Sequence, residues 1–211
     1  VGLLRVVPPP TSAFMLARAP EARLAGERGF AIDYEWQPLQ KLSPQLALAV
    51  VAAEDQKFPS HHGFDLDSIG EAWRARADGG RVRGASTLSQ QVAKNLFLWS
   101  GRSWLRKGLE AWFTLLIETL WPKARIIEVY LNVAEFGDGV YGAPAAAQRY
   151  FRRPALALGR AEAARLAAVL PNPRVLRVDR PSRYVWTRVR WIERQMSQLG
   201  DAYLEPVLGR R

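Results

Sequence analysis

The sequence SPQLALAVVAAED, residues 43–55, carries the signal that decides the fold. Its first two residues, Ser43 and Pro44, are typical of a helix N-cap and of the first helical position. Every residue from 46 to 53 is apolar, so a helix formed here has no polar face and has to be buried on all sides. The stretch therefore predicts a buried helix that ends at the carboxylate of Glu54.

Helical patterns account for most of the chain beyond this stretch. One further helix is predicted to begin near Ser86, and others cover residues 104–120, 122–132, 143–150, 160–170 and 183–199. Strand-like alternation is confined to short pieces of residues 1–40, so we expect a mainly α protein. On the helix at 104–120, the apolar side chains expected to face inward are Leu105, Leu109, Trp112, Phe113, Leu116 and Leu120.

The first part of the chain differs from the rest in composition. Residues 1–37 contain three consecutive prolines, Pro8 to Pro10, and are predicted to form an extended or irregular arm. We expect this arm to follow a removed membrane anchor, and residues 38–211 to form one domain.

Composition excludes several classes of protein. The 211 residues include no Cys, which excludes disulfides, thiolate catalysis and Cys-ligated metal centres. The two His residues leave little for a His-based metal site or a serine triad. The net charge of +10 favours an anionic partner, but nucleic acid, lipid head groups and phosphorylated substrates all remain open.

Glu54 is the first candidate for chemistry. The negative end of a helix dipole and burial both disfavour a charged carboxylate, so its position predicts a raised pKa. Such a pKa suits a general acid or base that works near neutral pH. An ordinary exposed carboxylate at a helix end is the alternative.

Four segments then resemble, in order and with similar spacing, the motifs of the peptidoglycan glycosyltransferases. Residues 54–63 resemble E-D-x-x-F-x-x-H-x-G, and residues 84–95 resemble G-G-S-T-x-T-Q-Q-x-x-K-N. Residues 106–110 resemble R-K-x-x-E, and residues 123–132 resemble K-x-x-I-L-E-x-Y-L-N apart from Ile127. The departures in the second motif, Ala85 for Gly and Ser89 for Thr, remove no charged group.

The chain is most similar to the monofunctional biosynthetic transglycosylases, because it has no S-x-x-K acylation motif of a penicillin-binding domain. The resemblance implies a bilobed, lysozyme-like helical domain. It also implies polymerisation of lipid II into β-1,4-linked glycan strands for cell wall biogenesis and cell shape. In the reaction that the resemblance implies, undecaprenyl pyrophosphate is released and the donor anomeric carbon is inverted.

The resemblance also implies roles for individual residues. Glu54 is expected to be the catalytic base and Glu110 the second catalytic carboxylate. The expected substrate-binding residues, which also serve moenomycin-type phosphoglycolipids, are Asp55, Phe58, Ser86, Thr87, Gln90, Gln91, Lys94, Asn95, Arg106 and Lys107. The residues expected to support the cleft are His61, Gly63, Glu128 and Asn132. No metal ligand is expected and no cofactor is required, while a divalent cation such as Mg²⁺ beside the pyrophosphate remains open.

The expected partners are lipid II, the nascent glycan chain, the membrane surface and other cell-wall synthesis or cell-division proteins, but no nucleic acid. The expected location is the bacterial cytoplasmic (inner) membrane, with a single-pass anchor ahead of residue 1 and the catalytic domain on the periplasmic side. Trp99 and Trp104 lie close to Arg102 in the sequence. This pattern suits a membrane interface, and packing in the core is the alternative.

Two other functions are considered. A lytic transglycosylase or lysozyme-like hydrolase would also be helical and use carboxylates, but would need no cations for a pyrophosphate. A basic nucleic-acid-binding module would use Arg183, Arg188, Arg190 and Arg194 on the last predicted helix and bind with strong salt dependence.

Overall fold

The computed structural model describes residues 1–65, 70, 86–101 and 103–209. Its helices are α1 (Ala13–Leu24), α2 (Pro44–Glu54), α4 (Leu88–Phe97), α5 (Trp104–Leu120), α6 (Lys123–Val133), α7 (Ala143–Phe151), α8 (Arg160–Val169), α9 (Arg183–Leu199) and α10 (Glu205–Leu208). Short 3-10 turns lie at Leu3–Arg5, Leu39–Lys41, Ala155–Ala157 and Asp201–Leu204. The mainly α prediction is confirmed.

The buried helix predicted from the apolar run is α2, and its residues 46–52 are all buried. It packs against α8 and α9, so side chains of both cover it. The Ser43 hydroxyl donates to the carbonyl of Leu158, 2.6 Å away, and accepts no hydrogen bond from the described first turn of its own helix. This hydrogen bond ties the start of α2 to the segment that precedes α8.

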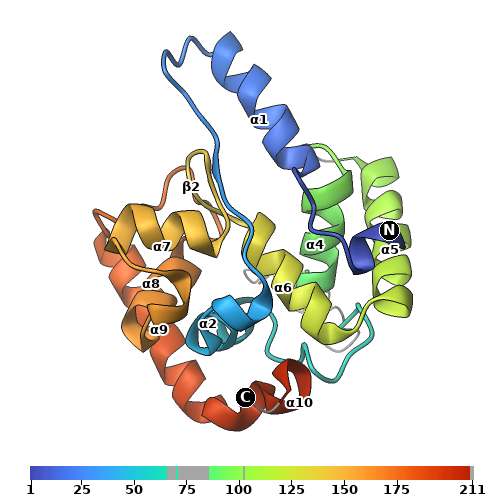
Figure 1. Ribbon diagram of the computed structural model, residues 1–211, viewed down its shortest axis with the longest axis vertical. Helices are drawn as coiled ribbons and strands as arrows, with labels where there is room; N and C mark the ends of the chain where they lie inside the picture. The colour runs from blue at the N-terminus through green and yellow to red at the C-terminus, as the bar shows by residue number, and fades with distance from the viewer. Residues whose placement is uncertain (66–69, 71–85, 102, 210–211) are drawn as a thin grey trace.

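The helices form two groups on either side of α6 (Figure 1). One group contains α4 and α5, which pack on each other, and α4 also packs on α6. The other group contains α2, α7, α8 and α9. The C-terminal end of α2, which carries Glu54, and α4, which carries Lys94, therefore belong to different groups. The residues with predicted chemistry are thus divided between the two groups.

A small sheet joins the N-terminal segment to the second group. Strand β1 (Asp33–Tyr34) pairs in parallel with β3 (Val140–Tyr141), which pairs antiparallel with β2 (Glu135–Gly137). The sequence indicated strand pieces only within residues 1–40, so the β2–β3 hairpin is a finding of the structure. It turns at Asp138 and Gly139, where the sequence indicates only that the helical pattern stops.

The prediction of an extended or irregular arm is wrong for residues 13–24, which form α1. The Ser12 hydroxyl caps this helix by accepting from the amide of Met15. Arg18 is 3% exposed and bonds to Asp138 at 2.8 Å and to Glu27 at 2.6 Å. Because α1 packs on α4 and Arg18 pairs with Asp138, 120 positions away, local sequence did not indicate what stabilises this helix.

The predicted inward face of α5 is wrong for Leu105, Trp112 and Leu120, whereas Phe113 packs against the core as predicted and the helix bounds agree. Its buried residues are Glu110, Thr114 and Ile117, while Leu105 is 70% and Trp112 56% exposed. Leu120 is exposed as well. The face that meets α4 therefore carries a carboxylate, and much of the apolar surface of α5 points to solvent.

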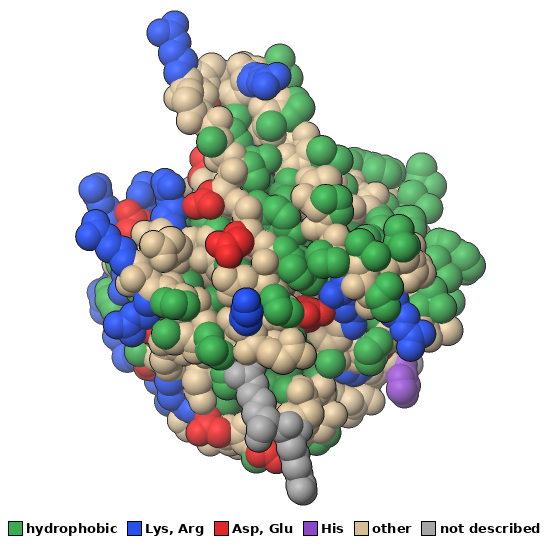
Figure 2. Space-filling model, viewed as in Figure 1, with side chains coloured by type: hydrophobic (Ala, Val, Ile, Leu, Met, Phe, Trp, Pro, Cys, Tyr) green, Lys and Arg blue, Asp and Glu red, His purple; other side chains and the backbone are tan. Residues whose placement is uncertain are grey.

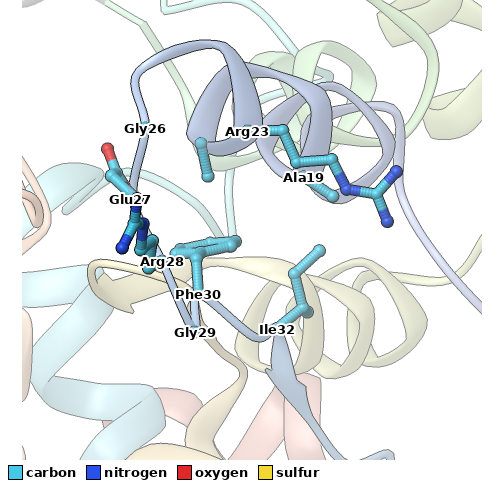
Figure 3. A pocket seen from close by; sticks show the side chains of 9 residues that line it. Ala19, Arg23, Gly26, Glu27, Arg28, Gly29, Phe30 and Ile32 are labelled. Atoms are coloured by element: carbon cyan, nitrogen blue, oxygen red, sulfur yellow. The ribbon is translucent and has the colours of Figure 1, made fainter.

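A cavity of about 600 Å³ lies between the end of α1 and residues 26–32 (Figure 3). Phe30 and Ile32 face it from the returning segment, and Ala19 faces it from α1. None of the residues with predicted catalytic or substrate-binding roles lines this cavity.

Gly142 allows the chain to turn from β3 into α7. Its φ is +84°, and a Cβ there would lie 2.5 Å from the carbonyl oxygen of Asn132. We expect Gly142→Ala to lower the free energy of unfolding by about 2–4 kcal/mol, since it adds both backbone strain and a backbone clash. Urea unfolding measures this, with Gly108→Ala as control.

Gly108 lies inside α5, and no atom of the described residues that an added Cβ would meet lies within 4 Å. Alanine there should stabilise the protein by about 0.5–1 kcal/mol. Equal urea midpoints for the two variants would contradict the structural argument.

Candidate active site

Glu54 lies at the C-terminal end of α2, between the two groups of helices, and its side chain is 16% exposed. Gln91 donates from Nε2 to Glu54 Oε2 across 3.2 Å, and Nη2 of Arg188 lies 3.6 Å from Oε1. Burial raises the pKa of Glu54, whereas Gln91, Arg188 and Lys94 act in the opposite direction. The raised pKa agrees with the direction predicted from sequence.

Asp55 joins the end of α2 to the start of α4. Its Oδ2 accepts from the backbone amide of Leu88 at 2.9 Å and lies 2.9 Å from Nε2 of His61. Nδ1 of the same imidazole accepts from the amide of Gly63. Asp55 was predicted to bind substrate, but it is only 7% exposed and its carboxylate is engaged by Leu88 and His61.

The first turn of α4 is closed by a capping box. The amide of Gln90 donates to Thr87 Oγ1, and the amide of Thr87 donates to Gln90 Oε1. The Thr87 hydroxyl also donates to the carbonyl of Gly63 at 2.7 Å. Both side chains were predicted to bind substrate, and the structure uses them to fix α4. One face of α4 is thereby held toward Glu54.

Lys94 follows Gln91 by three positions on α4 and is partly buried. Burial lowers the pKa of Lys94, as do Arg106 and Lys107, while Glu110 and Glu54 raise it. The ammonium also lies 5.6 Å from the centroid of the Phe14 ring. The first turn of α1 therefore lies beside Lys94.

Glu110 gathers two further cations at the start of α5. Its Oε2 accepts from Arg106 Nη1 at 2.7 Å, and its Oε1 accepts from Lys107 Nζ. Glu110 is 3% exposed, while the Lys107 side chain is 45% exposed. The buried Nε of Arg106 has no acceptor among the described residues.

The other predicted residues lie in several places. Phe58 is fully buried, with Lys123 Nζ 4.7 Å from its ring centroid, so it belongs to the core rather than to a substrate surface. Ser86 is exposed ahead of α4, and Asn95 is half-buried on it. Gly63 has a φ of +88°.

Glu128 and Asn132 hold the chain that leads into α2. Glu128 accepts from the amide of Leu39 at 2.8 Å, and Asn132 exchanges two 2.9 Å hydrogen bonds with the backbone of Gln37. These bonds fix the segment ahead of α2. The expected role of Glu128 and Asn132 in supporting the cleft stays a prediction.

Sequence reasoning missed two neighbours of the Glu54 group. Arg188 was considered only for a nucleic-acid surface, but on α9 it points at Glu54 and donates from Nε to the carbonyl of Ala168. Tyr130 was part of a motif without an assigned role, and its hydroxyl donates to Gln91 Oε1 at 3.1 Å. No local signal connects either residue with Glu54, since they lie on other helices.

The described part of the chain contains no group of three His, Asp or Glu side chains arranged to hold a metal ion. Both oxygens of Glu110 accept from cationic side chains, so this carboxylate has no strong need for a metal as a charge partner. The expected absence of a metal ligand stays a prediction, as does the open role of Mg²⁺ beside the pyrophosphate.

Comparison with known proteins gives one consistent family. The chain matches the family model described as Transglycosylase over residues 23–197. A biosynthetic peptidoglycan transglycosylase of Xanthomonas campestris pv. campestris is 59% identical over 203 residues, 96% of this chain and 82% of the relative. Proteins of the same description from Salmonella agona and Pseudomonas syringae pv. syringae are 58% identical over 201 residues and 57% over 206 residues. These cover 95% and 97% of this chain and 83% and 87% of the relatives.

Proposed function

Because this chain belongs to the transglycosylase family, we propose that it is a peptidoglycan glycosyltransferase that polymerises lipid II into β-1,4-linked glycan strands. One observation carries the proposal: the buried carboxylate of Glu54 interacts with Lys94 on α4, and Lys94 in turn interacts with Arg106 and Lys107 on α5. A lipid II polymerisation assay on the purified protein, with and without Mg²⁺, tests it. Absence of polymer under both conditions would contradict it.

Glu54 is the group that takes the proton. The C4 hydroxyl of the acceptor sugar attacks C1 of the donor, its proton passes to the Glu54 carboxylate, and the C1–oxygen bond to undecaprenyl pyrophosphate breaks. The bonding electrons leave with the pyrophosphate. Attack from the face opposite the leaving group inverts the anomeric carbon, so no covalent glycosyl-enzyme intermediate is required.

Lys94, Arg106 and Lys107 are the groups that receive the leaving pyrophosphate. Charge grows on its bridging oxygen as the bond breaks, and cations fixed before the reaction stabilise that charge without reorganising. Glu110 holds the two cations of α5 in place.

Glycan cleavage by a lytic transglycosylase or lysozyme-like enzyme is the runner-up function. Such an enzyme releases no pyrophosphate, so it would have no use for the cations beside Glu110. Clearing of purified cell-wall material, without polymer formation from lipid II, would favour this alternative.

The apolar face of α5 suits a membrane surface. Trp104 is 93% exposed and Leu105, Trp112 and Leu115 are also exposed, while Trp99 lies just beyond α4. Figure 2 shows hydrophobic side chains gathered over α5 and Lys and Arg side chains gathered on the opposite edge. No helix within the described ranges is long and apolar enough to span a bilayer. We place this face against the outer leaflet of the cytoplasmic membrane, where lipid II is presented, with the domain on the periplasmic side.

Replacing Trp99 and Trp104 together by Ser should lower the fraction of protein that floats with liposomes. Exposed indole rings gain free energy at a membrane interface, and we expect the partition coefficient to fall at least about tenfold. Trp186→Ser is the matched control, because this exposed tryptophan lies on α9 in the other group of helices. Equal flotation of the double variant and the wild type would exclude these residues from membrane contact.

A further inference from the structure

We propose that Tyr130 is a positioning residue for the catalytic base, acting through the side-chain amide of Gln91. The inference rests on the proposed function only in treating Glu54 as the base. The evidence is a chain of three side chains from three helices. Tyr130 on α6 donates to Gln91 Oε1 at 3.1 Å, and Gln91 on α4 donates from Nε2 to Glu54 Oε2 at 3.2 Å.

The Tyr130 hydroxyl favours one orientation of the amide over the other. The residue is 1% exposed, and Gln91 Oε1 is the acceptor that the structure gives its hydroxyl among the described residues. If the amide flipped, its NH₂ would face the phenol oxygen and the buried hydroxyl hydrogen would lose its acceptor. A buried donor without an acceptor is unfavourable, so the hydroxyl keeps Oε1 toward itself.

Burial keeps the hydroxyl in this donor role. The pKa of Tyr130 is raised well above its ordinary value by desolvation, and the charges of Glu54 and Asp55 act in the same direction. The phenol therefore stays protonated at every pH at which the enzyme would be assayed. A hydroxyl that stays protonated keeps donating to Gln91 Oε1 and so holds the amide in one orientation.

The orientation matters because a buried carboxylate stays ionised only where donors or cations stabilise its charge. With the amide as found, Nε2 of Gln91 meets Oε2 and Arg188 meets Oε1. A flipped amide would present its carbonyl oxygen to the carboxylate and favour the protonated form of Glu54. The other charged groups that act on Glu54 from the described residues are Lys94, which favours ionisation, and Asp55, which opposes it. Tyr130 thus helps to keep the base ionised in a buried site.

Tyr130→Phe should shift the pH dependence of the reaction with little change at high pH. Without the hydroxyl, both amide orientations become accessible and the pKa of Glu54 rises further. We expect the acidic limb of kcat/KM for lipid II to move up by about 0.5–1 pH unit. Above the limb, where Glu54 is ionised in both proteins, the rates should agree within about threefold. An unmoved limb would overturn the proposal.

A measurement without substrate separates this proposal from the proposed function. The Glu54 carboxyl can be titrated by NMR in the full chain, with its resonance identified by loss in Glu54→Gln. Tyr130→Phe should raise this pKa even if the protein forms no glycan. An unchanged Glu54 titration would overturn the proposal, whatever the polymerisation assay shows.

Two further variants show whether the effect passes through the amide. Tyr34→Phe is the matched control, because its hydroxyl donates to the carbonyl of Pro9 at 2.6 Å rather than to Gln91. It should leave the Glu54 titration unchanged. In a Gln91→Ala background, Tyr130→Phe should have no further effect on the Glu54 pKa. A shift of equal size in that background would show that the hydroxyl acts otherwise, and would overturn the proposal.

Discussion

Glu54→Gln should reduce lipid II polymerisation by about 10²–10⁴-fold, the contribution usual for a general base. The amide has nearly the same shape as the carboxyl group and can still accept from Gln91, but it cannot take the proton of the acceptor hydroxyl. In the wild type the rate should fall as the pH drops through the raised pKa of Glu54, because only the ionised form is a base. The residual rate of the variant should lack this acidic limb.

The same substitution should not unfold the protein. A carboxyl group whose pKa is raised on folding contributes stability that is present below its unfolded pKa and lost as the pH rises through the folded pKa. At neutral pH, a neutral amide at position 54 should therefore be at least as stable as the wild-type carboxylate. Thermal unfolding measures this.

Glu205→Gln is the matched control for this variant, since the carboxylate at the start of α10 is exposed. It should retain wild-type polymerisation. Undiminished lipid II turnover by a correctly folded Glu54→Gln protein would contradict the assignment of Glu54 as the base.

Lys94→Ala should produce the second largest loss, about 10²–10³-fold in polymerisation, which is the range for removing one fixed donor to a developing oxyanion. Lys94 is desolvated and aligned with Gln91 on one face of α4, so water replaces its charge poorly. Binding of a moenomycin-type phosphoglycolipid should weaken as well, because its phosphate would use the same ammonium. Fluorescence titration with that compound and initial rates with lipid II measure the two effects.

The control for Lys94→Ala is Lys41→Ala, which removes the same charge from an exposed side chain ahead of α2. It should change neither the titration nor the rate by more than about twofold, because exposed charges are strongly screened. If both variants bound the phosphoglycolipid as tightly as the wild type, Lys94 would not belong to the phosphate site.

Local sequence was sufficient to predict a helix wherever the apolar pattern and the capping residues lay within one segment. The apolar run before Glu54 required burial on every side, and α2 is buried among α8 and α9. The bounds of α5 and α9 agree with the predicted 104–120 and 183–199, because capping serines precede both helices. On α9, Val185, Val189, Ile192 and Met196 recur at helical spacing and form its buried face.

The candidate site was predicted unevenly. The motif resemblance drew attention to Glu54, Lys94 and Glu110, and the structure brings their charges together across α2, α4 and α5. It did not distinguish residues that face the site from residues that build it. Thr87 and Gln90 cap α4, and Phe58 fills the core, because a motif records only that residues occur together.

The sequence by itself determined the helical class, the buried helix that ends at Glu54 and the motifs that suggest the family. Only the tertiary structure decided which face of α5 is buried, that residues 13–24 form a helix, and which side chains surround the base. The reason is physical. Periodicity describes spacing within one segment, whereas the surroundings of a side chain depend on segments far away in the chain. Arg18 is paired with Asp138, and Glu54 lies beside Arg188, only because the fold brings their helices and loops together.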